Sequence, residues 1–397
     1  MIEGHGDDAY KYESIKSDFS SNICAHGSHQ GLLNHLAAHP ELIDHYPEPE
    51  AWSLEKMIAE RHGISPEQVL VTSGATEAIY LIARTFRLEP IIPEPTFSEY
   101  ADACSMFKDP LTPSMGNKMV NGKWLNGKCE MVNGKSLNGK SLNGKSLNGK
   151  CEMVNGKSLN GKSLNGKSLN GKSLNGKSLN GKSLNGKCLW LCNPNNPTGE
   201  AYDQLYIDRM MAEHELVVID QSYERYTDAH IMSPRWGCRT PYSLQIHSMT
   251  KDYGVPGLRL GYITAHESLT KQIRRHMHPW SVSALAVEAG KYLLEHDELL
   301  CCPDLQEAKR LGERLRGIEG VEVAPTQTNF MLCRLKQGSA AELKEYLAKE
   351  HHILIRDASN FKGLSPQHFR IAAQTPAEND ALVEAIRSFI SHLPFTI

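Results

Sequence analysis

The sequence predicts an α/β fold with a large domain around a mostly parallel central sheet and a smaller α+β domain. Short apolar runs bounded by turn residues alternate with longer helix-patterned segments, which is typical of a sheet covered by helices. After about residue 300 the pattern changes to helices separated by shorter strands. We therefore expect the large domain over 46–299 and the small domain over 1–45 and 300–397.

The individual elements follow from the same patterns, taken in chain order. Apolar runs predict buried strands, and longer amphipathic segments predict helices. In the large domain we expect strands at 69–72, 188–192, 216–220, 244–248 and 258–262, with helices at 76–87 and 203–214. In the small domain we expect strands at 329–333, 353–356 and 369–372, and a closing amphipathic helix at 377–390.

Length and composition narrow the class of protein. A chain of 397 residues can bury a substantial core. Its ten cysteines have no ligand-like spacing, so we expect neither a zinc site nor a disulfide framework, but a reduced cytoplasmic protein. The first residues lack a basic start followed by an apolar run, and nowhere are there 18 consecutive apolar residues. We therefore predict neither export nor a membrane partner.

A repeat interrupts the large domain at residues 117–187, where Asn-Gly-Lys occurs thirteen times. The segment carries a charge of about +12, which makes the rest of the chain acidic. With one Leu in most five-residue units, it offers little apolar area, so we expect a solvated loop. A stack of hairpins or a small β-solenoid is a second interpretation. A cationic arm is a third, but because the segment has no Arg and Trp124 as its single aromatic residue, we expect no nucleic-acid partner.

The most specific motif surrounds Lys251. This lysine stands three residues after Ser248, at the end of a predicted strand, and a Gly-rich turn and Arg259 follow it. Such a loop would bring the Lys251 amine close to two anion-binding groups, those of Ser248 and Arg259. The alternative is a surface lysine in a glycine-rich turn.

A second motif, Gly74-Ala75-Thr76, follows a predicted strand and opens a helix. The exposed backbone N–H groups and the positive end of the helix dipole make such a start an anion site. On its own the pattern also fits an ordinary helix cap.

Two further motifs follow predicted strands. One is the turn 193–199, which contains Asn196, and turns of this composition need no function. The other places Asp220 at the end of an apolar strand, three residues before Tyr223. An ionised carboxylate there needs a cationic partner, and a protonated pyridine nitrogen is one possibility.

Arg356 and Arg370 each follow or interrupt an apolar strand of the small domain. A guanidinium group in such a place is costly without an anion, and its planar fork suits a carboxylate or a phosphate. The alternative is a structural salt bridge.

The motifs around Gly74, Asn196, Asp220 and Lys251 resemble, in this chain order, those of the fold-type I pyridoxal-phosphate enzymes. These enzymes form the aspartate-aminotransferase superfamily. The resemblance implies that Lys251 forms a Schiff base with pyridoxal 5′-phosphate and that Asp220 pairs with the pyridine nitrogen. It also implies a homodimer, in which Tyr46 reaches the neighbouring subunit's cofactor. The other implied cofactor-binding residues are Gly74, Ala75, Thr76, Ser248 and Arg259 at the phosphate, Asn196 and Tyr223 at the ring's 3′ oxygen, and Phe97 stacked on the ring.

Within this superfamily the chain resembles the threonine-phosphate decarboxylase family, related to histidinol-phosphate aminotransferase. The resemblance rests on His5-Gly6, 18–23, 45–47, 279–286, 328–330 and 353–361. It implies decarboxylation of L-threonine O-3-phosphate to (R)-1-amino-2-propanol O-phosphate in cobalamin biosynthesis. Asn22, Arg356 and Arg370 would bind this small phosphorylated amino acid, with Arg370 on its carboxylate.

Two alternatives and one departure accompany this resemblance. Tyr223 also fits an aminotransferase of the histidinol-phosphate type, and a non-catalytic scaffold that displays a basic repeat is a further alternative. The departure is that family members have an ordinary strand and helix where the repeat stands. Loss of a sheet strand would destabilise the large domain even if every catalytic residue were present.

Overall fold

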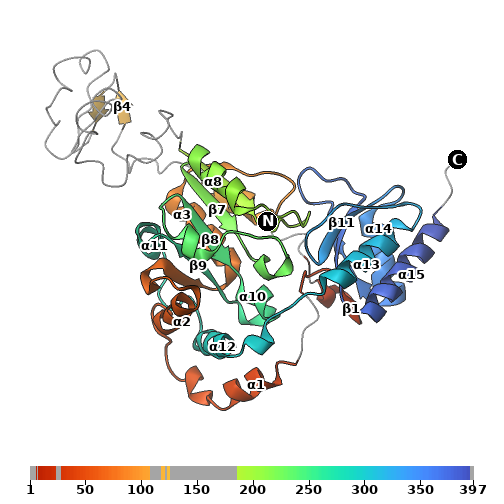
Figure 1. Cartoon of the computed structure of the whole chain (residues 1–397), viewed down its shortest axis with the longest axis horizontal. Coiled ribbons are helices and arrows are strands. Elements are labelled where there is room, and N and C mark those ends of the chain that lie inside the picture. Colours follow the sequence, from red (N-terminus) through yellow and green to blue (C-terminus); the bar gives the residue numbers. More distant parts are fainter. Residues whose placement is uncertain are drawn as a thin grey trace. The chain divides into compact units, whose positions relative to one another are not determined.

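The computed structural model describes residues 6, 8–23, 28–107, 118–120, 123–125 and 186–393 (Figure 1). The chain divides into two compact units, one made of Met1–Ser105 with Lys187–Ile397 and the other of Met106–Gly186. In the second unit, β4 (Lys118–Val120) pairs antiparallel with β5 (Lys123–Leu125). The rest of the predicted insert lies outside the described residues, so its three interpretations stay predictions.

A six-stranded sheet forms the centre of the first unit. Four neighbouring strands run parallel, and one strand runs antiparallel between two of the others. This confirms the predicted α/β class with a mostly parallel sheet. The strands are, in spatial order, β2 (Val69–Thr72), β9 (Gly261–Ala265), β8 (Ser243–His247), β7 (Leu216–Asp220), β6 (Lys187–Cys192) and β3 (Glu89–Ile91).

Helices surround this sheet because their apolar stripes pack against its buried faces. Several begin with a capping side chain; for example, the Asp203 carboxylate accepts a hydrogen bond from the Tyr206 backbone N–H at 2.8 Å. The helices of this part of the chain are α1 (Gln30–Ala37), α2 (Trp52–His62), α3 (Gly74–Phe86), α4 (Glu99–Met106), α8 (Gln204–Glu213), α9 (Pro234–Gly237), α10 (Met249–Asp252), α11 (Glu267–Arg274) and α12 (Ala284–Glu295).

A second, antiparallel sheet belongs to the carboxyl-terminal part of the same unit. Its strands are, in order, β10 (Val321–Val323), β11 (Phe330–Leu335), β14 (His368–Ala372) and β13 (Arg356–Asp357). Beside it, β1 (Ser17–Asp18) from the start of the chain pairs in parallel with β12 (Ile353–Leu354). The helices α13 (Leu305–Arg316), α14 (Ala340–His351) and α15 (Pro376–His392) gather around these strands (Figure 1).

The apolar side chains form separate clusters. One contains Phe19 together with side chains of α13, α14 and α15, whereas another joins Leu32 of α1 to side chains of α2 and α12. Both clusters lie within one compact unit. The division into a large domain at 46–299 and a small domain at 1–45 and 300–397 therefore stays a prediction.

Two predicted strands differ from the structure. The expected strand at 258–262 is displaced, because a short 3-10 helix occupies Pro256–Leu258 and Arg259 has a left-handed φ of 53°. The expected strand at 353–356 is divided between two sheets: Ile353–Leu354 pairs with β1, whereas Arg356–Asp357 pairs with β14. An apolar run indicates extended backbone, but it does not identify the strand that provides the partner.

Candidate active site

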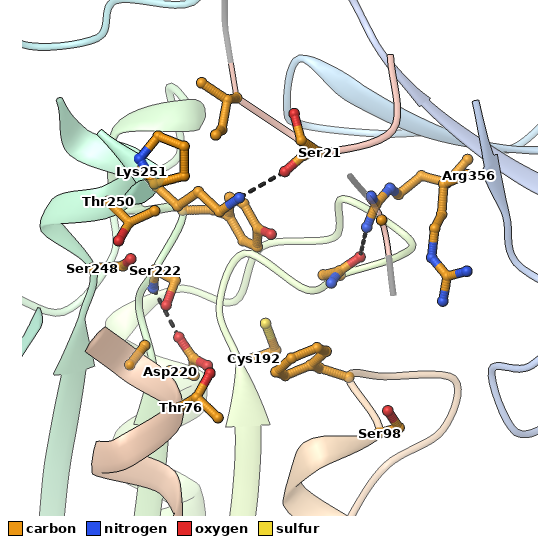
Figure 2. A pocket seen from close by; sticks show the side chains of 18 of the residues that line it. Ser21, Thr76, Ser98, Cys192, Asp220, Ser222, Ser248, Thr250, Lys251 and Arg356 are labelled. Atoms are coloured by element: carbon orange, nitrogen blue, oxygen red, sulfur yellow. Dashed lines mark hydrogen bonds between the residues drawn. The ribbon is translucent and has the colours of Figure 1, made fainter. Parts of the chain in front are cut away.

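A cavity of about 260 Å³ lies where three parallel strands of the large sheet end. Cys192 ends β6, Asp220 ends β7, and Ser248 follows β8, and all three side chains line the cavity (Figure 2). Ligands bind at this edge in open α/β sheets. The sequence-predicted residues that line it are Ala75, Thr76, Phe97, Asn196, Asp220, Tyr223, Ser248, Lys251, Arg259, Arg356 and Arg370.

The Lys251 side chain extends into this cavity from α10. Its Nζ donates a hydrogen bond to the backbone oxygen of Ser21 at 2.6 Å (Figure 2). The same Nζ lies 5.8 Å from the centre of the Tyr223 ring. Behind it, the Tyr226 hydroxyl donates to the Lys251 backbone oxygen at 2.8 Å. The amine is therefore held within the cavity by segments that are distant in the sequence.

The Asp220 carboxylate is 4% exposed and also faces the cavity. Its oxygens accept hydrogen bonds from the Ser222 backbone N–H at 2.9 Å and from the Tyr100 hydroxyl at 2.8 Å. Burial raises the pKa of this carboxyl, and the hydrogen bonds from Ser222 and Tyr100 oppose that rise. In the part of the chain that the structure describes, no ion pair involves Asp220. The carboxylate can therefore pair with a cation that enters the cavity.

The amino terminus of α3 forms a second wall. Gly74 has a φ of 84°, and a Cβ atom there would lie 2.7 Å from the Arg259 guanidinium. Glycine thus lets this cation approach the positive end of the helix, next to Ala75 and Thr76. Nearby, the buried Thr250 hydroxyl lines the cavity and has no hydrogen-bond partner among the described residues. Helix N–H groups, a guanidinium and hydroxyls together suit a phosphate.

Aromatic side chains form much of the remaining surface. The buried Tyr223 ring meets Phe330 edge-on at 5.0 Å, and burial raises the pKa of its hydroxyl to about 12, against the opposing charge of Arg370. Phe97 meets the Tyr100 ring edge-on at 5.8 Å. Flat apolar walls of this kind suit a planar ligand.

Arg356 and Arg370 lie directly opposite each other on β13 and β14. The Arg356 guanidinium donates to the Asp357 backbone oxygen at 2.6 Å and to Asn360 Oδ1 at 2.7 Å. The Arg370 guanidinium donates to Asn196 Oδ1 at 2.5 Å and to the Ser20 backbone oxygen.

All of these acceptors are neutral, and the Nε of Arg370 has no partner among the described residues. Burial lowers the pKa of both guanidinium groups, and for Arg356, where the charge of Arg370 contributes, it falls to about 10. Two buried cations that contact no carboxylate among the described residues are unfavourable, so the arrangement suits a ligand with two anionic groups.

Three predicted residues lie outside the cavity surface. Gly74 contributes indirectly, because its lack of a side chain lets the Arg259 guanidinium lie close to the start of α3. Asn22 is fully buried with a φ of 55°, and its side chain lies beside the Tyr223 hydroxyl, whose rise in pKa it opposes. Tyr46 is 84% exposed and packs on Trp280, with ring centres 5.3 Å apart. Its predicted role concerned a neighbouring subunit, and that role stays a prediction.

The sequence did not indicate several groups that complete the site. Tyr100 lies three residues beyond Phe97, and Asn360 lies four residues beyond Arg356, so spacing could have suggested both. The backbone oxygens of Ser20 and Ser21 carry no such signal, because they depend on the path of the amino-terminal segment.

The described residues lack the features of two other classes of protein. Among the described residues, no helix is both long and apolar enough to cross a membrane. Nor do those residues contain a group of three or more His, Cys, Asp or Glu side chains arranged to hold a metal ion.

Comparison with known proteins gives the family. The model of the family "Aminotransferase class I and II" matches residues 14–109 and 172–386. A provisionally named threonine-phosphate decarboxylase of Caldanaerobacter subterraneus is 29% identical over 402 residues, covering 96% of this chain and 93% of its own.

Solved structures agree with this result. The L-threonine-O-3-phosphate decarboxylase from Porphyromonas gingivalis is 31% identical with a TM-score of 0.73, covering 95% of this chain and 100% of its own. The histidinol-phosphate aminotransferase from Sinorhizobium meliloti, in complex with pyridoxal-5′-phosphate, is 17% identical with a TM-score of 0.66, covering 96% and 92%. The resemblance predicted from the sequence is confirmed: this chain belongs to the aminotransferase class I and II family, whose enzymes depend on pyridoxal 5′-phosphate.

Proposed function

We propose that this chain is a pyridoxal-phosphate enzyme that decarboxylates L-threonine O-3-phosphate to (R)-1-amino-2-propanol O-phosphate. The observation that carries the proposal is the pair Arg356 and Arg370, two buried guanidinium groups on one wall, with only neutral acceptors. The proposed substrate has a carboxylate and a phosphate, which supply two anions for the two cations. The two decarboxylase relatives support the same reaction by their names.

The residues of the cavity fit the proposed cofactor. Asp220 is a buried carboxylate without an ion-pair partner among the described residues, as a protonated pyridine nitrogen requires. The start of α3 with Arg259, together with Ser248 and the unpartnered Thr250 hydroxyl, would hold the phosphate. When bound, the cofactor supplies a conjugated ring that accepts electrons released at the substrate's Cα.

The chain's own groups then have separate tasks. Lys251 would attach the cofactor and return a proton to Cα after carbon dioxide leaves. Asp220 would hold the proton on the ring nitrogen, and Asn196 and Tyr223 would donate hydrogen bonds to the 3′ oxygen. Arg370 would bind the substrate carboxylate and Arg356 its phosphate, with Asn22 nearby. Phe97 would cover one face of the ring and exclude water.

The test combines product analysis with one substitution. We expect the purified protein, incubated with pyridoxal 5′-phosphate and L-threonine O-3-phosphate, to release carbon dioxide, and Lys251→Ala to abolish both this release and the visible absorption of bound cofactor. Lys271→Ala, on α11, is the control, because Lys271 does not line the cavity. Formation of a keto acid without carbon dioxide would instead support an aminotransferase of the histidinol-phosphate type.

We further propose that the chain works as a homodimer in which Tyr46 reaches the cofactor of the partner. Two exposed aromatic rings in contact, Tyr46 (84% exposed) and Trp280 (49%), support this, and Leu33 (57%) and Ile43 (74%) are further exposed apolar side chains of the preceding segment. Sedimentation equilibrium should give twice the chain mass, and Tyr46→Ala should weaken cofactor binding. A monomer that binds the cofactor fully would contradict the proposal.

We place the protein in the cytoplasm. No disulfide involves Cys188, Cys192, Cys238, Cys302 or Cys333 in the described chain, as expected in a reducing compartment, and Cys302 is the exposed member of this set. Cell fractionation followed by immunoblotting tests this placement, and recovery in a secreted or membrane fraction would contradict it.

A further inference from the structure

A buried tyrosine contacts the Asp220 carboxylate directly. Tyr100 is the second residue of α4, lines the cavity and is 1% exposed. Its hydroxyl donates a hydrogen bond to Asp220 Oδ2 at 2.8 Å. The other oxygen, Oδ1, accepts from the Ser222 backbone N–H at 2.9 Å. Each carboxylate oxygen therefore has one donor from the chain, and each can accept a further hydrogen bond from a ligand.

The two donors restrain the carboxylate in different ways. Ser222 lies two residues beyond Asp220, so its bond is the local turn that an aspartate side chain forms with its own backbone. The last torsion of an aspartate side chain is broad, because no staggered well restricts the planar carboxylate. A bond to Oδ1 alone leaves this torsion open. The second bond, from Tyr100 on a distant element, determines the plane of the carboxylate.

Aromatic neighbours hold the Tyr100 ring in place. In the sheet, Cys192 of β6 lies beside Asp220 of β7, and Trp190, two residues before Cys192, faces the same side. The Tyr100 ring stacks on the Trp190 ring, with centres 5.7 Å apart and an interplanar angle of 26°. Phe97 meets the Tyr100 ring edge-on at 5.8 Å. The hydroxyl cannot leave Asp220 without disturbing these contacts.

The Tyr100 hydroxyl keeps its proton in this place. Burial raises the pKa of Tyr100 well above its ordinary value, and the Asp220 charge adds to this. Burial and the Asp220 charge also raise the pKa of the Cys192 thiol, which lines the same cavity. Tyr100 is therefore the donor, and its hydrogen bond favours the ionised form of Asp220.

We infer that Tyr100 is a positioning residue that fixes the plane of the Asp220 carboxylate, so that this carboxylate faces a cation in the cavity. The segment that carries Tyr100 also carries Phe97, which would cover one face of the proposed cofactor's ring. One short segment thus orients both the ring's apolar wall and the partner of its nitrogen. This part of the inference rests on the proposed function.

A second tyrosine provides a matched control. The Tyr80 hydroxyl, on α3, donates to Glu99 Oε2 at 2.7 Å. Glu99 adjoins Tyr100 in α4, but the lining of the cavity includes neither Tyr80 nor Glu99. Tyr100→Phe and Tyr80→Phe therefore each remove one hydroxyl that donates to a carboxylate. The first change concerns the cavity, and the second does not.

The first experiment requires no cofactor. Carbon NMR of protein labelled at the Cζ atom of tyrosine reports the hydrogen bond of each hydroxyl, and the two Phe variants assign the Tyr100 and Tyr80 signals. We expect Asp220→Asn to shift the Tyr100 signal and to leave the Tyr80 signal in place. A Tyr100 signal that does not move would overturn the inference. If Tyr100→Phe does not fold, through-space contacts with the Trp190 ring identify the same signal.

The second experiment measures the dissociation constant of pyridoxal 5′-phosphate. We expect Tyr100→Phe to weaken binding about tenfold, because a carboxylate that can turn forms a poorer charge-assisted hydrogen bond with the ring nitrogen. Tyr80→Phe should leave the constant unchanged. In an Asp220→Asn background, Tyr100→Phe should cause no further loss. A full tenfold loss in that background would overturn the inference, because Tyr100 would then act without Asp220.

Nitrogen NMR of bound cofactor labelled in its ring provides a signature that a loss of packing alone would not change. The ring-nitrogen signal should shift in Tyr100→Phe and stay in place in Tyr80→Phe. Identical signals in the two variants would contradict the positioning role. If the wild-type protein binds no cofactor, the proposed function fails, whereas the carbon NMR result still decides whether Tyr100 holds Asp220.

Discussion

At the scale of single residues, Arg356 and Arg370 show what a sequence can and cannot indicate. Each interrupts an apolar strand, so the need for an anion was predictable from the sequence alone. Their position directly opposite each other was not, because it depends on the register between β13 and β14. The same holds for Asp220: the strand end was predictable, but its bond from Tyr100, 120 positions away, was not.

The arginine pair should lower the stability of the ligand-free protein. We expect Arg356→Met to raise the free energy of unfolding by about 1 kcal/mol without ligand, because like charges opposite each other in a sheet repel. The same variant should lose the stabilisation that L-threonine O-3-phosphate gives the wild type. Thermal unfolding with and without the substrate measures both effects. Arg387→Met, which removes an exposed partner of Glu384, is the control; a larger loss of stability in Arg356→Met than in this control would contradict the explanation.

The raised pKa of Asp220 gives a pH dependence of known sign. A carboxyl group whose pKa is higher in the folded than in the unfolded chain destabilises the fold once it is ionised. The ligand-free wild type should therefore lose stability relative to Asp220→Asn as the pH rises from the ordinary aspartate pKa through the raised one. Urea unfolding of both proteins across the acidic range measures this difference. Parallel curves would show that Asp220 does not titrate as described.

At the scale of elements, most predicted strands and helices lie where the structure has them, because apolar periodicity is a local property. The exceptions depend on tertiary partners. Ile355 separates two strands that belong to different sheets, and Gly261 begins β9 where a Cβ atom would lie 2.9 Å from the Ala75 backbone nitrogen. Neither fact can be obtained from the hydrophobic pattern.

Helix starts are local, and α14 allows a direct test. The Ser339 hydroxyl accepts from the Glu342 backbone N–H, and the Glu342 carboxylate accepts from the Ser339 backbone N–H at 2.9 Å, forming a capping box. Ser339→Ala should lower the free energy of unfolding by about 1 kcal/mol. Ser339→Thr keeps the acceptor and should lose much less. Urea unfolding measures both losses, and equal losses in the two variants would show that the capping hydrogen bond does not stabilise the fold.

At the scale of the whole molecule, the repeat raised the question of whether the large sheet is complete enough to fold. Six strands are described, and β6, directly after the repeat, pairs along its length with β7. The strand β3, which was not predicted, contains Pro90 and pairs with β6. Proline is confined to edge strands and strand starts, which explains why β3 lies at the edge of the sheet. A proline also weakens the sequence pattern of a strand, which explains why β3 was not predicted.

Removal of the repeat tests this point. With 117–185 replaced by a short Gly-Ser linker, we expect the unfolding midpoint and the affinity for pyridoxal 5′-phosphate to stay within experimental error, because the strands around the site belong to the other compact unit. A scrambled repeat of equal length and charge is the control. If the deletion variant loses both properties while the scrambled one keeps them, the segment replaces core structure.

The path of the amino-terminal segment has a practical consequence for anyone who handles this enzyme. The backbone oxygens that hold Arg370 and Lys251 belong to Ser20 and Ser21, and β1 just before them is anchored beside Arg356 through β12. Proteolytic cleavage after Asn22, or expression of a chain that begins after it, would remove the two backbone oxygens that accept from Arg370 and Lys251. Affinity tags are therefore better fused after α15, and preparations deserve a check for clipping by mass spectrometry before any loss of turnover is blamed on a point mutation.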